Sequence, residues 1–96
     1  MSTFKVSVFT YPIGSDDWKL RHSFYFNAEK LEMEKDGEYY TVRITASELP
    51  LEHYQKSERS IGCRKAEQSV FDYASVEGNT YTFPKVQSVD FKGVWD

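Results

Sequence analysis

Residues 31–44 read LEMEKDGEYYTVRI, and this stretch decides the class of fold. Apolar and polar residues alternate on both sides of Asp36-Gly37, a dipeptide that tolerates the positive φ angles of a tight turn. A two-residue loop at Asp36-Gly37 pairs Met33 with Tyr40, so the apolar side chains of both arms meet on one face. The stretch therefore predicts an antiparallel hairpin. Its opposite face would carry Glu32, Glu34, Tyr39 and Thr41.

Two further strands are predicted upstream of this hairpin. In residues 3–11, Phe4, Val6 and Val8 share one face, as expected for a strand. In residues 18–27, the corresponding face carries Trp18, Leu20, His22, Phe24 and Phe26. The intervening residues 12–17 read PIGSDD, which is dense in turn formers. The pattern predicts a second antiparallel hairpin.

A third hairpin is predicted in the C-terminal third of the chain. Residues 70–76 and 80–83 flank Gly78-Asn79, a dipeptide that suits a tight turn. Residues 66–77 also fit one face of a helix, but we favour the strand. Pro84 then predicts an edge strand or a bulge, and residues 86–95 resume the alternation.

One short helix is predicted over residues 50–57. Pro50 suits a first helical position, and Glu52 and Lys56 have the spacing of a helical ion pair. With about seven strands, this predicts a mainly β fold in one domain over residues 1–96, an antiparallel sandwich or a small, partly open barrel. An α+β fold with one helix on an antiparallel sheet is the alternative.

The composition is that of a folded chain in a reducing compartment. Of the 96 residues, 40% are hydrophobic and 17% aromatic, which is enough apolar surface to offset chain entropy. Cys63 is the single cysteine, which favours a reducing environment. No export signal is visible, and no apolar run approaches the roughly 20 residues that span a bilayer. We therefore expect a cytoplasmic protein, or one in a host cytoplasm if it is viral.

Candidates for catalysis and metal binding are few in the sequence. His22 lies in an apolar alternation, which predicts a partly buried, satisfied imidazole. Neither His22 nor His53 has a Cys, Asp or Glu at metal-ligand spacing. Cys63 with His22 or His53 would be a minimal nucleophile pair, and the nearby positive charges would favour its thiolate, but we do not expect such a pair to be catalytic. The sequence predicts no catalytic residue, no metal site and no cofactor, and so a non-enzymatic protein.

A small basic cluster follows the predicted helix. It consists of Lys56, Arg59, Arg64 and Lys65. Such a cluster suits a phosphate backbone, but the net charge of −3, the interspersed acids and the missing recognition motifs argue against nucleic acid. A solvated loop is the expected interpretation.

The aromatic residues outnumber what one face of each strand needs for a core. The chain holds seven Tyr, seven Phe and two Trp, so some are expected at the surface, where aromatic anchors are enriched at interfaces. The predicted anchors lie opposite the main apolar stripe and are Phe9, Tyr11, Tyr25 and Tyr39. The predicted charged contacts of the first hairpin are Glu32, Glu34, Asp36 and Glu38.

These features predict a protein-binding domain without catalytic activity. The favoured hypothesis is a stoichiometric inhibitor of a basic partner such as a nuclease, of toxin-immunity or phage anti-host type. One alternative is a structural phage or bacterial subunit that self-assembles into a homo-oligomer through an open β edge. The other is a small-ligand or carbohydrate-binding module that stacks Trp18 or Trp95 on a sugar.

Overall fold

The structure is mainly β and antiparallel, as the alternation predicted. The computed structural model describes residues 3–15, 17–57 and 60–95, with side chains for these except 54–57, 60–61 and 92–95. Two short 3-10 turns accompany eight strands, and the described residues form no α-helix. The elements are β1 (Thr3–Thr10), η1 (Trp18–Leu20), β2 (His22–Ala28), β3 (Lys30–Asp36), β4 (Tyr39–Thr45), β5 (Leu51–Ser57), β6 (Ser60–Lys65), η2 (Ser69–Asp72), β7 (Ser75–Glu77) and β8 (Thr80–Trp95).

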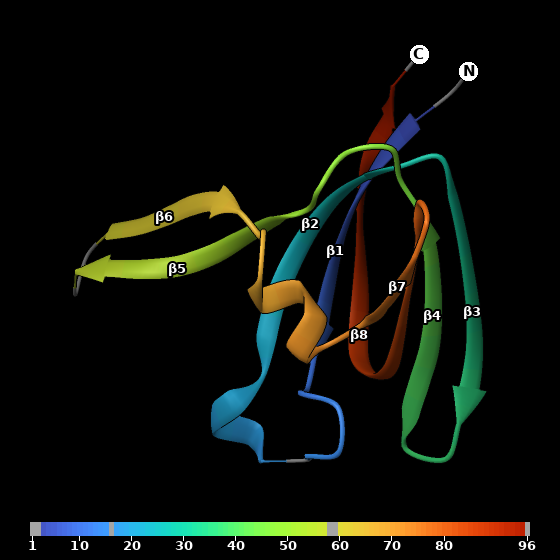
Figure 1. Ribbon diagram of the computed structural model, residues 1–96, viewed down its shortest axis with the longest axis horizontal. Helices are drawn as coiled ribbons and strands as arrows, with labels where there is room; N and C mark the ends of the chain where they lie inside the picture. Colours follow the sequence, from blue (N-terminus) through green and yellow to red (C-terminus); the bar gives the residue numbers. More distant parts are fainter. Residues whose placement is uncertain (1–2, 16, 58–59, 96) are drawn as a thin grey trace.

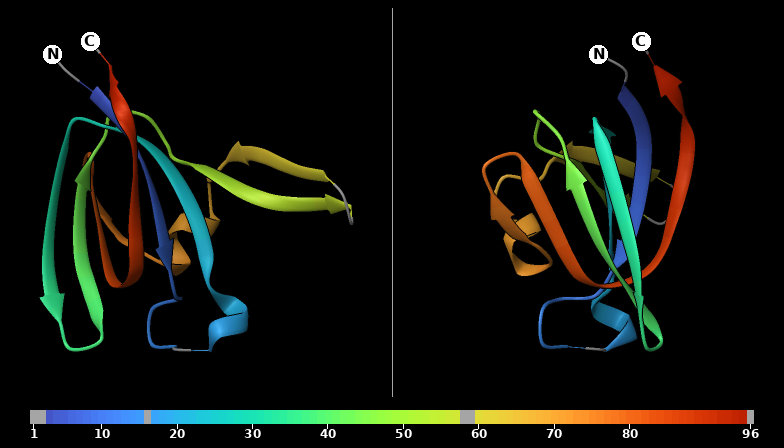
Figure 2. Two further views of the ribbon diagram at one scale, coloured as in Figure 1. Left: turned by 180° about the vertical axis from the view of Figure 1, so that it is seen from behind. Right: turned by 90° about the vertical axis from the view of Figure 1, so that its right-hand side faces the viewer.

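The strands form one open sheet in the order β3-β4-β8-β1-β2-β5-β6, with β7 added beside β8. β8 pairs with β4 through its first half and with β1 through its second half, and Val86 is the residue shared by both ladders. From Tyr40 to Val42, β4 advances by two residues, whereas β8 advances by three between their partners Val86 and Phe83. The bulge predicted at Pro84 is therefore confirmed, and Figure 2 shows β8 curving strongly through the molecule.

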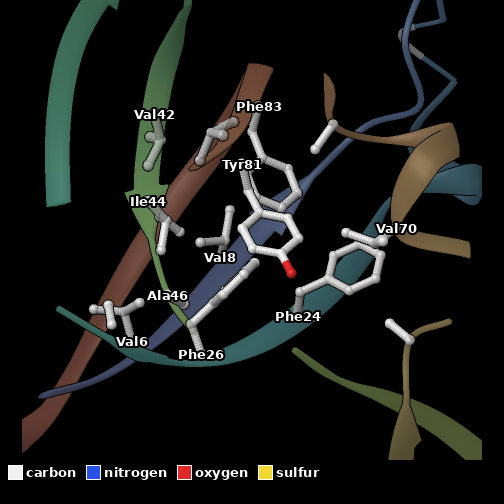
Figure 3. Packing of buried hydrophobic residues seen from close by; sticks show 14 residues of the cluster. Val6, Val8, Phe24, Phe26, Val42, Ile44, Ala46, Val70, Tyr81 and Phe83 are labelled. Carbon is white, nitrogen blue, oxygen red and sulfur yellow. The ribbon is translucent and has the colours of Figure 1, made fainter. Parts of the chain in front are cut away.

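The curvature of β8 brings two parts of the sheet face to face around the core. Phe26 of β2 packs edge-on against Tyr81 and Phe83 of β8, with ring centroids 5.1 and 5.7 Å apart. The Phe24 ring is tilted against Phe83, with the centroids 5.8 Å apart. Figure 3 shows these rings pointing toward one another between β1, β4 and β8. The aliphatic part of this core includes Val6, Val8, Val42, Ile44, Val70 and Val86.

The first predicted hairpin forms with the predicted faces but in a shifted register. Asp36 pairs with Tyr39, so the loop is Gly37-Glu38 and Met33 faces Val42 rather than Tyr40. Gly37 has φ +65°, and no described non-glycine residue has a positive φ, which fits a type II′ turn with glycine first. Every partner moves by two residues, and since the side-chain period is two, the faces stay as predicted.

The predictions for the C-terminal third are partly confirmed. Glu77 pairs with Thr80, so Gly78-Asn79 is the predicted loop, and Gly78 has φ +60°. Residues 66–77 form neither the predicted long strand nor an α-helix. Instead, the 3-10 turn η2 places Val70 in the core before the three-residue strand β7 begins.

The predicted helix over residues 50–57 is wrong, because these residues form β5. Pairing with β6 and β2 decides their conformation, since such long-range contacts override a weak local preference. The strand predicted to begin at Trp18 also starts later, at His22. Asp17 accepts a hydrogen bond from the Lys19 N–H at 3.0 Å and caps the turn η1 in its place.

Within the described part of the chain, no helix has the length and apolar character needed to cross a membrane.

Phe83→Ala is expected to lower the free energy of unfolding by about 3–5 kcal/mol, because it opens a cavity between both parts of the sheet. Phe71, whose side chain is 52% exposed, is the matched control. Phe71→Ala should cost about 0.5 kcal/mol or less. Urea unfolding followed by tryptophan fluorescence measures both values, and similar losses in the two variants would contradict this core.

Candidate functional site

A groove runs over the face of β2, β5 and β6 that lies opposite the core. Its volume is about 680 Å³ and it is open to solvent. Alternation from the buried Phe24 and Phe26 turns Tyr25 outward, and Tyr25 pairs with Leu51 of β5 on that face. The groove is lined by Lys5, Tyr25, Phe26, Asn27, Glu48, Leu49, Leu51, His53, Cys63 and Lys65.

The floor of the groove is an aromatic stack. The rings of Tyr25 and His53 lie 4.4 Å apart and are inclined by 7°. Leu49 and Leu51 stand beside them with 41% and 42% of their surface exposed. Large apolar side chains left half-exposed around a concave site are typical of a binding surface.

The rim of the groove carries charged and reactive groups. Lys5 comes from β1 and Lys65 from β6, whereas Glu48 comes from the loop that precedes β5. The Cys63 thiol is exposed and lies across the ladder from His53. The charged side chains of the groove are therefore two lysines and one glutamate.

β5 is attached to the main sheet by a short ladder. In the described residues, two pairs join it to β2, Phe24 with Glu52 and Tyr25 with Leu51. Figure 1 shows β5 and β6 extending away from the other strands beyond this point. Side-chain contacts on both faces of β5 therefore matter for the position of the groove.

Glu52 makes these contacts on the core side of β5. Its side chain is 5% exposed, and Oε2 lies 3.2 Å from His22 Nε2 of β2. Arg64 Nε of β6 donates to the other carboxylate oxygen, and the Ser69 hydroxyl of η2 donates to Oε2. One carboxylate thus joins β2, β5, β6 and η2. We call Glu52, His22, Arg64 and Ser69 the Glu52 cluster.

The surroundings of the cluster fix the imidazole of His22. Its ring lies 4.9 Å from the Phe24 ring and 5.4 Å from the Tyr73 ring. The Tyr73 hydroxyl donates to the Leu20 carbonyl at 2.8 Å. Burial, aided by the negative charges of Asp72 and Glu52, raises the pKa of Tyr73 and keeps it a neutral donor. His22 is partly buried and hydrogen-bonded, as its place in the alternation predicted.

The Glu52 carboxylate is held in its charged form. Burial raises its pKa, but the hydrogen bonds from Ser69 and Arg64 and the charges of Arg64 and His22 outweigh that effect. The pKa of Glu52 therefore lies below its ordinary value. The Ser69 hydroxyl donates to Glu52 and not to His22, so this geometry satisfies a buried carboxylate rather than activating a nucleophile.

The four predicted aromatic anchors lie in three places. Tyr25 lines the groove. Phe9 lies under the Arg21 guanidinium, 4.7 Å from its ring centroid. Tyr11 is 7% exposed and packs edge-on against Tyr39 at 5.5 Å. Tyr11 is therefore largely covered, and contact of the other three rings with a partner stays a prediction.

The predicted acidic contacts are partly occupied by ion pairs. Arg43 binds Glu32 at 3.5 Å and Glu34 at 3.1 Å, and Lys30 binds Glu32 at 3.2 Å. The hydrogen bond and charge of Lys30, with those of Arg43, hold the pKa of Glu32 below its ordinary value. The remaining two, Asp36 and Glu38, are exposed at the end of the β3–β4 hairpin. Contact of these residues with a partner stays a prediction.

Sequence reasoning missed the groove and the Glu52 cluster. It assigned Glu52 to a helical ion pair with Lys56. Even read as a strand, this segment would place the apolar Leu51 inside and the charged Glu52 outside, whereas the structure buries Glu52, exposes Leu51 and leaves His53 partly buried. The side chains of Lys56 and Trp95 and all of Arg59 lie outside the described residues. Trp18 is 63% exposed and does not line the groove.

No family model, no curated protein and no solved structure matches this chain. The interpretation of the groove therefore rests on its own geometry.

Glu52→Gln is expected to lower the free energy of unfolding at pH 7 by about 1–3 kcal/mol, because the amide loses charge-assisted hydrogen bonds. Glu34→Gln, at a side chain 67% exposed, is the matched control and should change stability by about 0.5 kcal/mol or less.

The effect of Glu52 depends on pH in a defined direction. Its pKa is lower in the folded than in the unfolded chain, so its stabilisation is present above the unfolded value of about 4.3. The stabilisation is lost as pH falls through the folded pKa. Urea unfolding between pH 7 and pH 3 should show the wild type and Glu52→Gln converging in acid. A constant difference would contradict the buried, charged carboxylate.

Proposed function

We propose that this protein is a non-enzymatic protein-binding domain, and that a side chain of the partner enters the groove on β2, β5 and β6. The observation that carries the proposal is the stacked floor of Tyr25 and His53 beside the half-exposed Leu49 and Leu51. Aromatic anchors surrounded by apolar side chains supply most of the binding energy at protein interfaces.

The fixed position of the groove supports this proposal. Its floor belongs to paired strands, and the Glu52 cluster holds β5 against β2 from the opposite face. A site that is already ordered loses little conformational entropy when a partner binds. Tight, stoichiometric binding suits the inhibitory role that we predicted from the sequence, and that role remains part of the proposal.

The chemistry of the groove changes the partner that we propose. Glu32 and Glu34 form ion pairs with Arg43, and this partial neutralisation weakens the case for a basic partner at the β3–β4 hairpin. In the groove, Lys65 is the cation on the outermost strand, β6, and Glu48 is the single acid among the lining residues. Charge complementarity therefore favours an acidic segment at the groove.

Binding to a purified partner distinguishes the two faces. The partner is first isolated by affinity capture from an extract of the source cells and then titrated by calorimetry. Leu49→Asp should weaken binding by about tenfold or more, because it places a charge at the apolar wall and loses roughly 1.4 kcal/mol. Tyr39→Ala, on the hairpin face, should leave the affinity within about threefold, and unfolding midpoints check that both variants fold.

Three outcomes would overturn the proposed site. Loss of binding in Tyr39→Ala alone would move the contact to the acidic hairpin. Full affinity in both variants would exclude both faces. A filament or ring in sedimentation, with no bound partner, would favour the self-assembling subunit instead.

A further inference from the structure

We propose that the groove receives an extended segment of the partner, which adds as a strand to the open edge of β6 and carries an acidic residue two positions from an apolar one. This inference rests on the proposed function and specifies the chemistry of its partner. It follows from the two edges of the sheet, the direction of the β6 backbone groups and the side chains beside them.

The two ends of the sheet differ in how they are protected. β3 and β6 are the terminal strands in the described sheet order. Five of the seven residues of β3 are charged, which deters pairing with another chain, and these are Lys30, Glu32, Glu34, Lys35 and Asp36. In β6, two of six residues are charged, and one of them, Arg64, is bound to Glu52. The edge beside the groove is therefore the one less protected by charge.

The backbone hydrogen bonds show which groups of β6 face this open edge. The Ala66 N–H donates to the Pro50 carbonyl at 2.8 Å, and this pair continues the register of Lys65 with Leu51. Residues of an antiparallel ladder alternate between bonding to the partner strand and pointing away from it. Cys63 and Lys65 therefore direct their backbone groups away from β5.

One of these outward groups is already used within the chain. The Lys65 carbonyl accepts a hydrogen bond from the Glu67 N–H at 3.1 Å. The Cys63 N–H and carbonyl and the Lys65 N–H remain directed at the open edge, where the described sheet places no further strand. An added strand would bond to these three groups, as in peptide recognition by strand addition.

The same two residues determine which side chains the added strand needs. Cys63 and Lys65 both line the groove, and an added strand would lie about 4.8 Å from β6. Alternate residues of that strand would project over the groove about 6.7 Å apart. An acidic side chain beside Lys65 would meet its ammonium, and a large apolar one beside Cys63 would extend over Cys63 toward the His53 ring.

The probe for this inference is a library of random twelve-residue peptides displayed on phage and selected on the full chain. We expect enriched peptides with an acidic and an apolar residue at positions i and i+2. A synthetic peptide from the selection is then titrated by fluorescence anisotropy. Lys65→Glu should reverse the selected charge, so that lysine or arginine replaces the acidic residue.

Two substitutions at Cys63 test the backbone bond. Cys63→Pro removes the outward N–H and is compatible with an edge strand, because that N–H makes no bond to β5. It should weaken peptide binding by about tenfold. Cys63→Ala keeps the N–H and should lower the peptide affinity by about threefold or less. The difference in affinity between the two variants therefore measures the contribution of the hydrogen bond from the residue 63 N–H. Unfolding midpoints confirm that both variants fold.

Failure of this inference is distinguishable from failure of the proposed function. Equal binding of the selected peptide by Cys63→Pro and Cys63→Ala, or no enriched peptide, would overturn strand addition. If the proposed function still holds, Leu49→Asp would nevertheless lower the affinity for the full-length partner. A dimer in sedimentation that Cys63→Pro abolishes would overturn it in favour of a second copy on the edge. An unchanged charge preference in Lys65→Glu would overturn the acidic component.

Discussion

The structure depends on one constraint: the open sheet must cover its own apolar face. A sheet with an apolar face must bury that face, and here the described residues offer no α-helix to do so. The sheet covers itself because β8 pairs with β4 along one half and with β1 along the other. The bulge at Pro84 lets β8 bend, and Phe83 then meets Phe24 and Phe26 across the core.

The β5–β6 hairpin extends beyond this core, so it is held differently. Two residue pairs attach β5 to β2, and the buried carboxylate of Glu52 adds bonds to β6 and η2. Burying a carboxylate is costly unless its oxygens are bonded, and His22, Arg64 and Ser69 meet that requirement. The cluster does not activate a nucleophile, but it fixes the strand whose other face forms the groove.

The groove and the β6 edge together support the proposed binding function. The Tyr25–His53 stack gives an aromatic floor, and the outward backbone groups of Cys63 would set the direction of the proposed segment. The contrast with β3 supports this interpretation, because charged residues protect that edge more than they protect the β6 edge. Apolar contact, strand pairing and charge complementarity would then act at one place.

By itself, the sequence determined β1 to β4 and β8, the turns at Gly37 and Gly78 and the faces of these strands, because period-two alternation and the positive φ of a glycine turn are local properties. It expected a solvated loop where Arg64 and Lys65 lie in β6. It misplaced the hairpin register by two residues and predicted a helix where β5 forms. Only the tertiary structure decided that β5 is a strand, that Glu52 is buried, and that Tyr11 is buried against Tyr39 whereas Tyr25 lines the groove. The physical reason is that each of these depends on pairing between residues distant in the chain, which local pattern does not encode.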